Sequence, residues 1–284
     1  MEWVTAINEA IEYMEENLLT NLPCEQIAAH VYLSSFHFQR TFQALTGMGI
    51  SEYIRNRRLS LAGHELLSSN LKVIDIAYKY GYETPESFTK AFTRFHGISP
   101  VNAKRQGVTL KSFNRLSIKI SLEGGSCIDY RIVEKEAFEV VALTRVFEGE
   151  TFRTEIPAFW KYYFDKGLHN VACGALGICA EEMNYASRWR YGIGDFRENV
   201  QKVPEEFEVL QIPSYTWAIF TCKGPMPETI QNMWKRVYSE WLPQSKYELL
   251  MDYDLEYYTE GDTKSNDYVS EIWIPVKEKQ RNEA

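Results

Sequence analysis

Residues 27–47 read IAAHVYLSSFHFQRTFQALTG, and residues 76–97 repeat the pattern as IAYKYGYETPESFTKAFTRFHG. Ile27 and Ala28 recur forty-nine positions later as Ile76 and Ala77. Four more residues recur at an offset of fifty: Phe38 as Phe88, Arg40 as Lys90, Phe42 as Phe92 and Gly47 as Gly97. Each stretch fits a short helix, a turn and a second helix. The repeat therefore predicts two helix-turn-helix motifs that would enter two adjacent stretches of DNA major groove.

The second helix of each motif is expected to have one apolar face and one polar, cationic face. In the second copy Thr84 can cap this helix, and Pro85 suits its first turn. The apolar stripes are Phe38, Phe42 and Leu45 in one copy and Phe88, Phe92 and Phe95 in the other. The opposite faces carry Phe36, Gln39, Arg40 and Gln43, and Ser87, Lys90 and Arg94. Such side chains can hydrogen bond base edges; the alternative is a solvated face of an ordinary helical domain.

Charge is distributed unevenly along the chain. The whole chain has 31 Lys+Arg against 39 Asp+Glu, which by itself argues against a nucleic-acid partner. Residues 30–107 nevertheless hold ten basic and five acidic side chains, whereas residues 1–29 hold six Glu and no Lys or Arg. Phosphate binding depends on local cations. We therefore expect the DNA-binding surface within residues 30–107, where a connecting helix over 51–67 adds Arg55, Arg57 and Arg58 as phosphate-contact candidates.

These motifs, with the closing segment Phe95-His96-Gly97-Ile98-Ser99-Pro100, resemble the DNA-binding domain of the AraC/XylS family over residues 3–106. The resemblance implies seven helices, with a long helix joining the two motifs. By motif position it implies these base-facing residues: Phe36, Gln39, Arg40, Pro85, Glu86, Ser87 and Lys90. Pro85 donates no hydrogen bond and Glu86 repels phosphate, so the second motif is expected to have the weaker role. Alternatively, Glu86 accepts from a cytosine amine.

Length and composition fit two ordinary domains. The chain has 284 residues and is 45% hydrophobic. No segment approaches the roughly 18 apolar residues of a membrane helix, and the start lacks the regions of a signal peptide. The five cysteines form no CxxC pair and the five histidines are scattered. This pattern predicts a cytoplasmic protein with no membrane partner, no metal and no cofactor.

The second part of the chain contains its own, weaker repeat. Residues 141–161 align with residues 215–235 at an offset of seventy-four, so that Trp160-Lys161 corresponds to Trp234-Lys235. Each half predicts two strands, a helix and two more strands. The expected elements are 127–134, 139–148, helix 152–166, 175–181 and 188–196, then 206–212, 215–223, helix 226–241, 249–258 and 267–276.

Aromatic residues and carboxylates lie close together near the end of this part. Strand alternation places Asp254, Glu256 and Tyr258 on one face, and likewise Glu271 and Trp273 on one face. Aromatic walls around a carboxylate suit a lipophilic cation. Ordinary sheet packing with solvated glutamates is the alternative for any single residue.

The duplicated layout, Trp241-Leu242-Pro243-Gln244-Ser245, Leu255-Glu256-Tyr257-Tyr258 and Ile272-Trp273-Ile274-Pro275-Val276 resemble the GyrI-like effector-binding domain over residues 126–277. The resemblance implies a pseudo-twofold fold with a central cleft for amphipathic or cationic ligands. It maps the family's buried glutamate onto Glu256. It also suggests cleft walls at Trp160, Tyr191, Trp217 and Trp273, to which strand alternation adds Tyr258.

The sequence thus predicts a multidomain protein. An all-α double helix-turn-helix domain (1–107) is followed by a linker (108–125), an α+β domain with duplicated ββαββ halves (126–278) and a polar tail (279–284). The expected function is transcription regulation, by an activator that is not an enzyme and that senses a small amphipathic or cationic aromatic molecule. Its expected partners are promoter DNA and RNA polymerase, and a monomer suffices because one chain carries two motifs. A small-molecule hydrolase and a protein-interaction module remain alternatives for the second domain.

Overall fold

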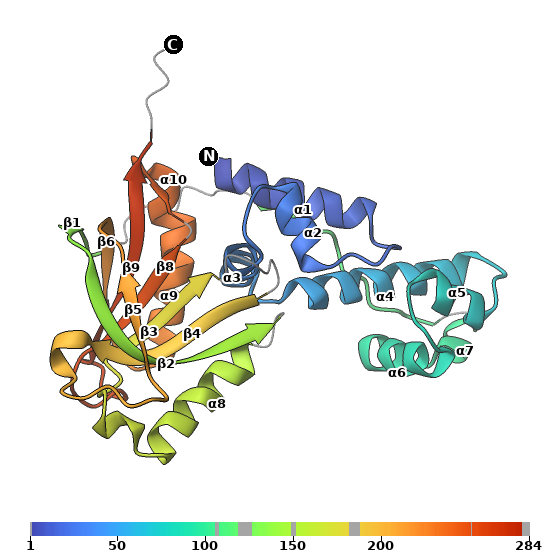
Figure 1. Cartoon of the computed structure of the whole chain (residues 1–284). Coiled ribbons are helices and arrows are strands. Elements are labelled where there is room, and N and C mark those ends of the chain that lie inside the picture. Colours follow the sequence, from blue (N-terminus) through green and yellow to red (C-terminus); the bar gives the residue numbers. More distant parts are fainter. Residues whose placement is uncertain are drawn as a thin grey trace, which may run out of the picture. The chain divides into compact units, whose positions relative to one another are not determined.

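The computed structural model describes residues 2–105, 108–118, 127–148, 152–181, 188–250 and 252–279 (Figure 1). The described residues leave out residues 119–125 of the expected linker and residues 280–284 of the expected tail. They also leave out the side chain of Phe36. The chain forms two compact units. The helical unit comprises Met1–Leu33 and Met48–Lys119, and the sheet unit comprises Ser34–Gly47 and Ile120–Ala284.

The helical unit is built from helices joined by short turns. Leu59 and Leu66 of the longest helix pack with Ile76, Phe88 and Phe92 in a buried core. The helices are α1 (Glu2–Glu16), α2 (Cys24–His30), α4 (Ile50–Ser68), α5 (Val73–Lys79), α6 (Pro85–His96) and α7 (Pro100–Ala103). With α3 (Ser35–Thr46), seven helices lie within residues 2–103, as the family resemblance implied.

The two repeated helices, α3 and α6, begin and end in the same way. The Ser34 hydroxyl accepts from the His37 N–H, and the Thr84 hydroxyl accepts from the Ser87 N–H. Each hydroxyl satisfies a backbone donor that the first helical turn leaves unpaired. Both helices end at a glycine in the left-handed region, with φ of 75° at Gly47 and 81° at Gly97. The repeat therefore encodes the helices themselves, including their caps.

Residues 108–118 belong to the helical unit, although the sequence suggested that a linker starts there. Their backbone N–H groups donate to side chains of three helices: Lys111 to His96 Nδ1, Phe113 to Ser60, Leu116 to the Tyr53 hydroxyl and Ile118 to Asn8. An extended segment without a strand partner needs such acceptors when it is part-buried. The described part of the expected linker is thus an ordered edge of the helical unit.

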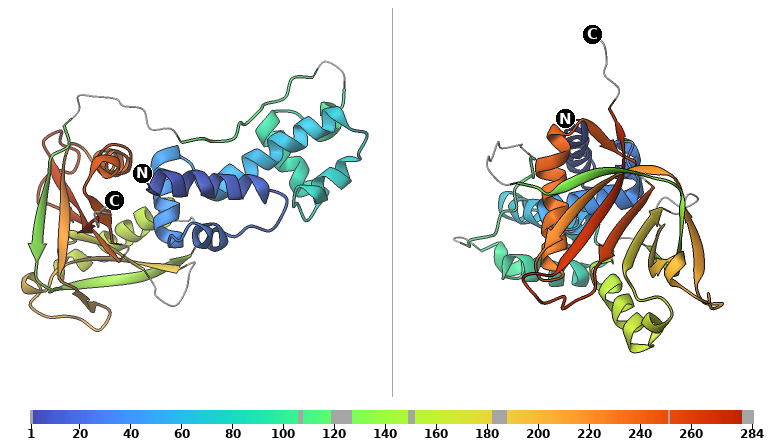
Figure 2. Two further views of the ribbon diagram at one scale, coloured as in Figure 1. Left: turned by 90° about the horizontal axis from the view of Figure 1, so that it is seen from above. Right: turned by 90° about the vertical axis from the view of Figure 1, so that its left-hand side faces the viewer.

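The sheet unit contains one antiparallel sheet, which Figure 2 shows from two further directions. Its strand order is β1-β6-β9-β8-β3-β4-β2-β5, with β7 paired to β9. Apart from β7, this order is the same from either end when the two halves of the repeat are exchanged. The first strand of each half joins the other half, since β1 pairs with β6 and β5 pairs with β2. The strands are β1 (Tyr130–Lys135), β2 (Phe138–Glu148), β3 (Leu176–Glu181), β4 (Arg188–Phe196), β5 (Glu208–Ile212), β6 (Tyr215–Lys223), β7 (Tyr247–Leu249), β8 (Tyr253–Tyr258) and β9 (Val269–Glu278).

One long helix follows the second strand of each half, as predicted. In the first half it is α8 (Phe152–Asp165). In the second half α9 (Glu228–Arg236) continues as a π-helical turn (Val237–Trp241) and α10 (Leu242–Gln244). Short 3-10 turns occupy Leu168–Asn170 and Arg197–Asn199. The structure therefore confirms the expected fold class and adds one short strand, β7.

Candidate effector site and recognition helices

The site is built on the two central strands of the sheet, where the two halves of the repeat meet. In the β3–β8 register Gly177 lies opposite Glu256, and Cys179 lies opposite Asp254. Directly opposed residues of antiparallel strands share a face. Asp254, Glu256 and Cys179 therefore project from the same face at the centre of the sheet.

Each of the two carboxylate oxygens of Glu256 accepts a hydrogen bond. Trp234 Nε1 donates to Oε1 at 3.0 Å, and the Tyr258 hydroxyl donates to Oε2 at 2.8 Å. Trp234 lies on α9, whereas Tyr258 lies two residues beyond Glu256 on β8. These neutral donors stabilise a carboxylate whose side chain is only 14% exposed.

A second pair of aromatic side chains lies on the α8 side of the site. Trp160 Nε1 donates to the Tyr191 hydroxyl at 2.9 Å, and the Trp160 ring meets the Tyr258 ring edge-on at 5.3 Å between centroids. Burial, reinforced by the charge of Glu256, raises the pKa of Tyr191 and of Tyr258 well above the usual value for tyrosine. Both hydroxyls therefore stay protonated; that of Tyr258 donates to Glu256, whereas that of Tyr191 accepts from Trp160.

Arg40 of α3, which belongs to the sheet unit, reaches the carboxylates. Its Nη1 lies 3.2 Å from Asp254 Oδ2, its Nη2 lies 3.0 Å from Glu256 Oε1, and its guanidinium carbon lies 3.5 Å from the centre of the Trp234 ring. Nη1 also lies 3.7 Å from Cys179 Sγ. Burial on its own would lower the pKa of Arg40, but Cys179, Asp254 and Glu256 raise it overall.

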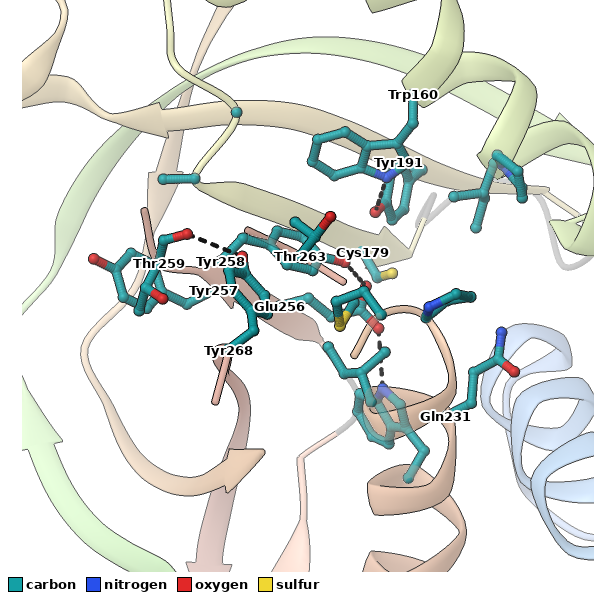
Figure 3. Close-up of a pocket in the computed structure, with 18 of the residues that line it drawn as sticks. Trp160, Cys179, Tyr191, Gln231, Glu256, Tyr257, Tyr258, Thr259, Thr263 and Tyr268 are labelled. Atoms are coloured by element: carbon teal, nitrogen blue, oxygen red, sulfur yellow. Dashed lines mark hydrogen bonds between the residues drawn. The ribbon is translucent and has the colours of Figure 1, made fainter. Parts of the chain in front are cut away.

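A cavity of about 1240 Å³ in the sheet unit is lined by several of these residues: Arg40, Trp160, Cys179, Tyr191, Trp234, Glu256 and Tyr258. Figure 3 shows Trp160 and Tyr191 on one side of it, Glu256 and Tyr258 in the middle and Gln231 of α9 on the other side. Gly177 makes room for this arrangement. A Cβ atom there would lie 2.4 Å from the Tyr191 hydroxyl oxygen and 3.5 Å from Glu256 Oε2.

Four of the six side chains expected in the pocket line this cavity: Trp160, Tyr191, Glu256 and Tyr258. Trp217 and Trp273 do not line it. Trp273 lies opposite Leu255, which alternates with Asp254 and Glu256 along β8, and so it projects from the other face. There Trp273 packs against Trp217 in a separate hydrophobic cluster. Neither tryptophan is a wall of this cavity, because the period of two in a strand sends adjacent residues to opposite faces.

The residues proposed to face DNA differ between the two recognition helices. On α6 the side chains of Glu86, Ser87, Lys90 and Arg94 are all exposed, as a groove-facing surface requires. On α3 Gln39 is 4% exposed and the side chain of Arg40 is 14% exposed.

The connecting helix α4 uses two of its three arginines within the helical unit. Arg57 binds Glu15, with Nη2 2.7 Å from Oε2, and Arg58 donates to the Leu18 and Thr20 carbonyls. Arg55 is exposed and is therefore the phosphate-contact candidate that the structure favours.

Several residues of the site are not identified by the sequence pattern. Strand alternation places Asp254 on the correct face but gives it no role, and the repeat includes Trp234 without marking it as a wall of the site. Trp234 follows Trp160 by seventy-four residues, the offset of the repeat, so the repeat itself carried the signal for a second tryptophan wall. Nothing in the sequence signalled Cys179, Gly177 or His37, whose Nε2 lies 3.6 Å from Asp254 Oδ2.

Among the described residues, no helix combines the length and the hydrophobicity that a membrane-spanning segment requires. Within the same residues, no group of three or more His, Cys, Asp or Glu side chains is arranged to hold a metal ion.

Comparisons with known families agree with this division of the chain. Residues 131–276 match the integron-associated effector binding protein family (Cass2), and residues 27–106 match a helix-turn-helix domain family. The first match covers more than half of the 284 residues, and the chain belongs to this Cass2 family of effector-binding proteins. With its AraC-type N-terminal domain, it is a DNA-binding transcription regulator that carries a GyrI-like effector-binding domain.

Individual relatives match one domain at a time. The HTH-type transcriptional activator AarP of Providencia stuartii is 44% identical over 94 residues, which are 33% of this chain and 70% of AarP. The multiple antibiotic resistance protein MarA of Escherichia coli (strain K12) is 29% identical over 94 residues, 33% of this chain and 74% of MarA. The structure of SAV2435 bound to tetraphenylphosphonium aligns with 52% of this chain and 94% of its own, at 23% identity and a TM-score of 0.48.

Proposed function

We propose that this regulator is a transcription activator that binds a small aromatic cation in the cavity of its sheet unit, with Glu256 as the principal counter-ion. One observation carries the proposal: a nearly buried carboxylate lies in a large cavity between two tryptophans from the two halves of the repeat. A buried carboxylate favours a cationic ligand because Coulomb attraction is stronger away from water. Indole faces add cation–π attraction.

The DNA-binding half of the proposal rests on the two recognition helices. Phe36, Gln39 and Arg40 of α3 are proposed to face bases in one groove segment. Ser87, Lys90 and Arg94 of α6 face the next groove segment and contact mainly phosphates, and Glu86 lies beside them on the same exposed face. One chain carries both helices, so a monomer suffices on an asymmetric site. An activator also needs contact with RNA polymerase, and AarP, whose name describes it as an activator, supports that direction of regulation.

The chemistry of the site favours binding over hydrolysis. Burial raises the pKa of the Cys179 thiol well above its usual range, so this group is protonated near neutral pH. The raised pKa values of Tyr191 and Tyr258 likewise keep both hydroxyls protonated. A protonated thiol and two protonated phenols make a donor-lined binding site and not an activated nucleophile.

The test measures both halves of the proposal in one experiment. The DNA upstream of the protein's own gene is labelled and titrated by fluorescence anisotropy, with and without tetraphenylphosphonium or phenylguanidinium. A scrambled duplex and neutral triphenylphosphine oxide serve as controls. We expect salt-sensitive, sequence-specific binding that a cation alters and the neutral compound does not. Equal affinity for both duplexes would contradict sequence-specific regulation, and no response to either cation would contradict the effector class.

A further inference from the structure

The carboxylates of the effector site already hold a cation that the chain itself supplies. Arg40 bridges Asp254 and Glu256 through different nitrogens, at 3.2 and 3.0 Å, while its plane lies over Trp234. The Arg40 side chain is only 14% exposed, and that of Asp254 only 2%. These ion pairs are largely buried, and each is also a hydrogen bond between the guanidinium and a carboxylate. They therefore form a specific binding arrangement, unlike an exposed surface ion pair.

The same arginine is the base-facing candidate of the first recognition helix. Its equivalent fifty residues later, Lys90 on α6, is exposed. A guanidinium whose Nη groups are bound to two carboxylates cannot also donate to guanine O6 and N7. While Arg40 is bound to these two carboxylates, the DNA-facing arginine of α3 is therefore unavailable. His37, one helical turn before Arg40, lies on the same side of α3 and also faces Asp254, at 3.6 Å.

The arrangement around Arg40 also describes the cation that would replace it. Two carboxylates, on alternate residues of β8, each accept a hydrogen bond from the planar, forked guanidinium of Arg40. The Trp234 ring covers the face of this guanidinium. A guanidinium or amidinium carried by an aromatic ring supplies the same fork and adds a group that can contact Trp160 or Tyr191. A phosphonium has charge but no N–H, and it leaves this donor geometry unused.

We infer that Arg40 is an internal ligand of the effector cavity, and that an aryl guanidinium or amidinium activates the protein by displacing it and freeing α3 for DNA. The inference rests on the proposed function and specifies the ligand class and the regulation of the same site. In thermodynamic terms, the docked and released positions of α3 are two states, and the effector binds only the released one. Docking then weakens the apparent affinity for the effector by the fraction of molecules that are released.

The first experiment measures phenylguanidinium binding to the full chain by calorimetry. Three chains are compared: wild type, Arg40→Ala, and Lys90→Ala as the matched control that removes the equivalent cation from the other helix. We expect Arg40→Ala to bind phenylguanidinium about tenfold more tightly than wild type, the factor for a docked state populated at about 90%. Lys90→Ala should bind with wild-type affinity. Equal or weaker binding by Arg40→Ala would overturn the role of Arg40.

Further arms separate the failure of this inference from the failure of the proposed function. If phenylguanidinium binds both wild type and Arg40→Ala equally well, the cation site stands and only the internal ligand is wrong. If tetraphenylphosphonium binds Arg40→Ala as tightly as phenylguanidinium, the preference for a forked cation is wrong. If neither cation binds either chain, the effector class itself fails.

A second variant tests release from the other side of the contact. Asp254→Asn removes one of the two carboxylates that hold Arg40 but leaves α3 and its DNA-facing residues intact. Promoter DNA affinity without any effector should then rise severalfold, and the further gain on adding phenylguanidinium should shrink. Unchanged basal affinity in a folded Asp254→Asn protein would overturn the inference, because docking by Arg40 would then not limit DNA binding.

Discussion

Helices α3 and α6 share one sequence pattern, but the cationic residue at the equivalent position has a different environment in each helix. Both begin at a hydroxyl cap and end at a left-handed glycine. Arg40 on α3 nevertheless binds two carboxylates and a tryptophan, while Lys90 at the equivalent position of α6 is exposed. The pattern determines the helix and its caps, whereas two carboxylates more than two hundred positions away determine which groups the cation binds. A helix-turn-helix match alone is therefore not evidence that its basic residue is available to DNA.

The largest expected effect comes from removing the carboxylate that distinguishes the surroundings of α3 from those of α6. Glu256→Gln, made in an Arg40→Ala chain so that release of Arg40 cannot mask the loss, should weaken phenylguanidinium binding by at least about 100-fold. That factor corresponds to about 3 kcal/mol, the lower end of the cost of leaving a buried charge without its partner. Calorimetry on the full chain measures it.

The matched control for this change is Glu271→Gln in the same Arg40→Ala chain. Glu271 is a similarly part-buried carboxylate, bound to Arg131 on the other face of the sheet. Its removal should leave phenylguanidinium affinity within about twofold. Comparable losses in both variants would indicate that net charge, and not the position of Glu256, governs cation binding.

The next largest effect is steric and is confined to the sheet unit. Gly177→Ala would place a Cβ atom 2.4 Å from the Tyr191 hydroxyl oxygen, so the tyrosine and its Trp160 partner must shift. We expect a loss of about 2 kcal/mol in unfolding free energy, typical of overpacking a buried site, together with weaker cation binding. Tyr191→Phe in the same chain removes the clashing oxygen and should recover much of the stability. Failure of this rescue in thermal unfolding would place the strain elsewhere.

The fold was largely predictable because it follows from short-range signals. Two capped helix-turn-helix copies and a strand-helix repeat with an offset of seventy-four are local patterns, and each local choice agreed with the final fold. The short strand β7 (Tyr247–Leu249) was not expected, because three residues carry no measurable alternation. The ordered segment 108–118 was also missed, because its hydrogen-bond acceptors lie on distant helices.

The candidate site was predictable in part, and strand alternation explains the division. Glu256 and Tyr258 share a face because they are two residues apart on β8, and that geometry is local. Their aromatic character makes Trp217 and Trp273 equally good candidates for cavity walls. They nevertheless lie on the other face of the sheet, and which face they occupy relative to Glu256 depends on the cross-strand register. The approach of Arg40 to Asp254 and Glu256 joins residues more than two hundred positions apart, and no periodicity reports such a contact.

The end of α6 is held by a neutral histidine, His96, whereas α3 makes charged contacts through Arg40. His96, the last residue of α6, accepts at Nδ1 from the Lys111 N–H, so its proton is on Nε2, which donates to the Leu59 carbonyl. Burial lowers the pKa of His96 below its usual 6.5. The unfolded chain therefore binds the proton more readily, and stability should decline as pH falls below 6.5, by no more than about 1.4 kcal/mol per pH unit.

His96→Gln provides the control for this pH dependence. A glutamine can keep one donor and one acceptor at the same place but does not titrate. Urea unfolding of the two chains between pH 7.5 and 5 should show a steeper acid loss for wild type. Parallel profiles would mean that other groups account for the acid sensitivity of the helical unit.

The smallest expected effects concern the exposed face of α6. If Lys90 contacts a phosphate, Lys90→Ala should weaken promoter and scrambled DNA by a similar factor of a few and reduce the salt slope by about one. Anisotropy titrations across a salt series measure both quantities. A loss restricted to the promoter would instead show that Lys90 contacts a base.

Glu86, one turn before Lys90, distinguishes the two roles left open for α6. If its carboxylate only repels phosphate, Glu86→Gln should strengthen binding to promoter and scrambled duplexes alike, by a factor of about two to five. If the carboxylate accepts from a cytosine amine, the same change should weaken the promoter alone, because the specific hydrogen bond is lost while repulsion is relieved everywhere. The two duplexes therefore move together in the first case and apart in the second. That difference decides whether α6 adds sequence recognition to α3 or only electrostatic affinity.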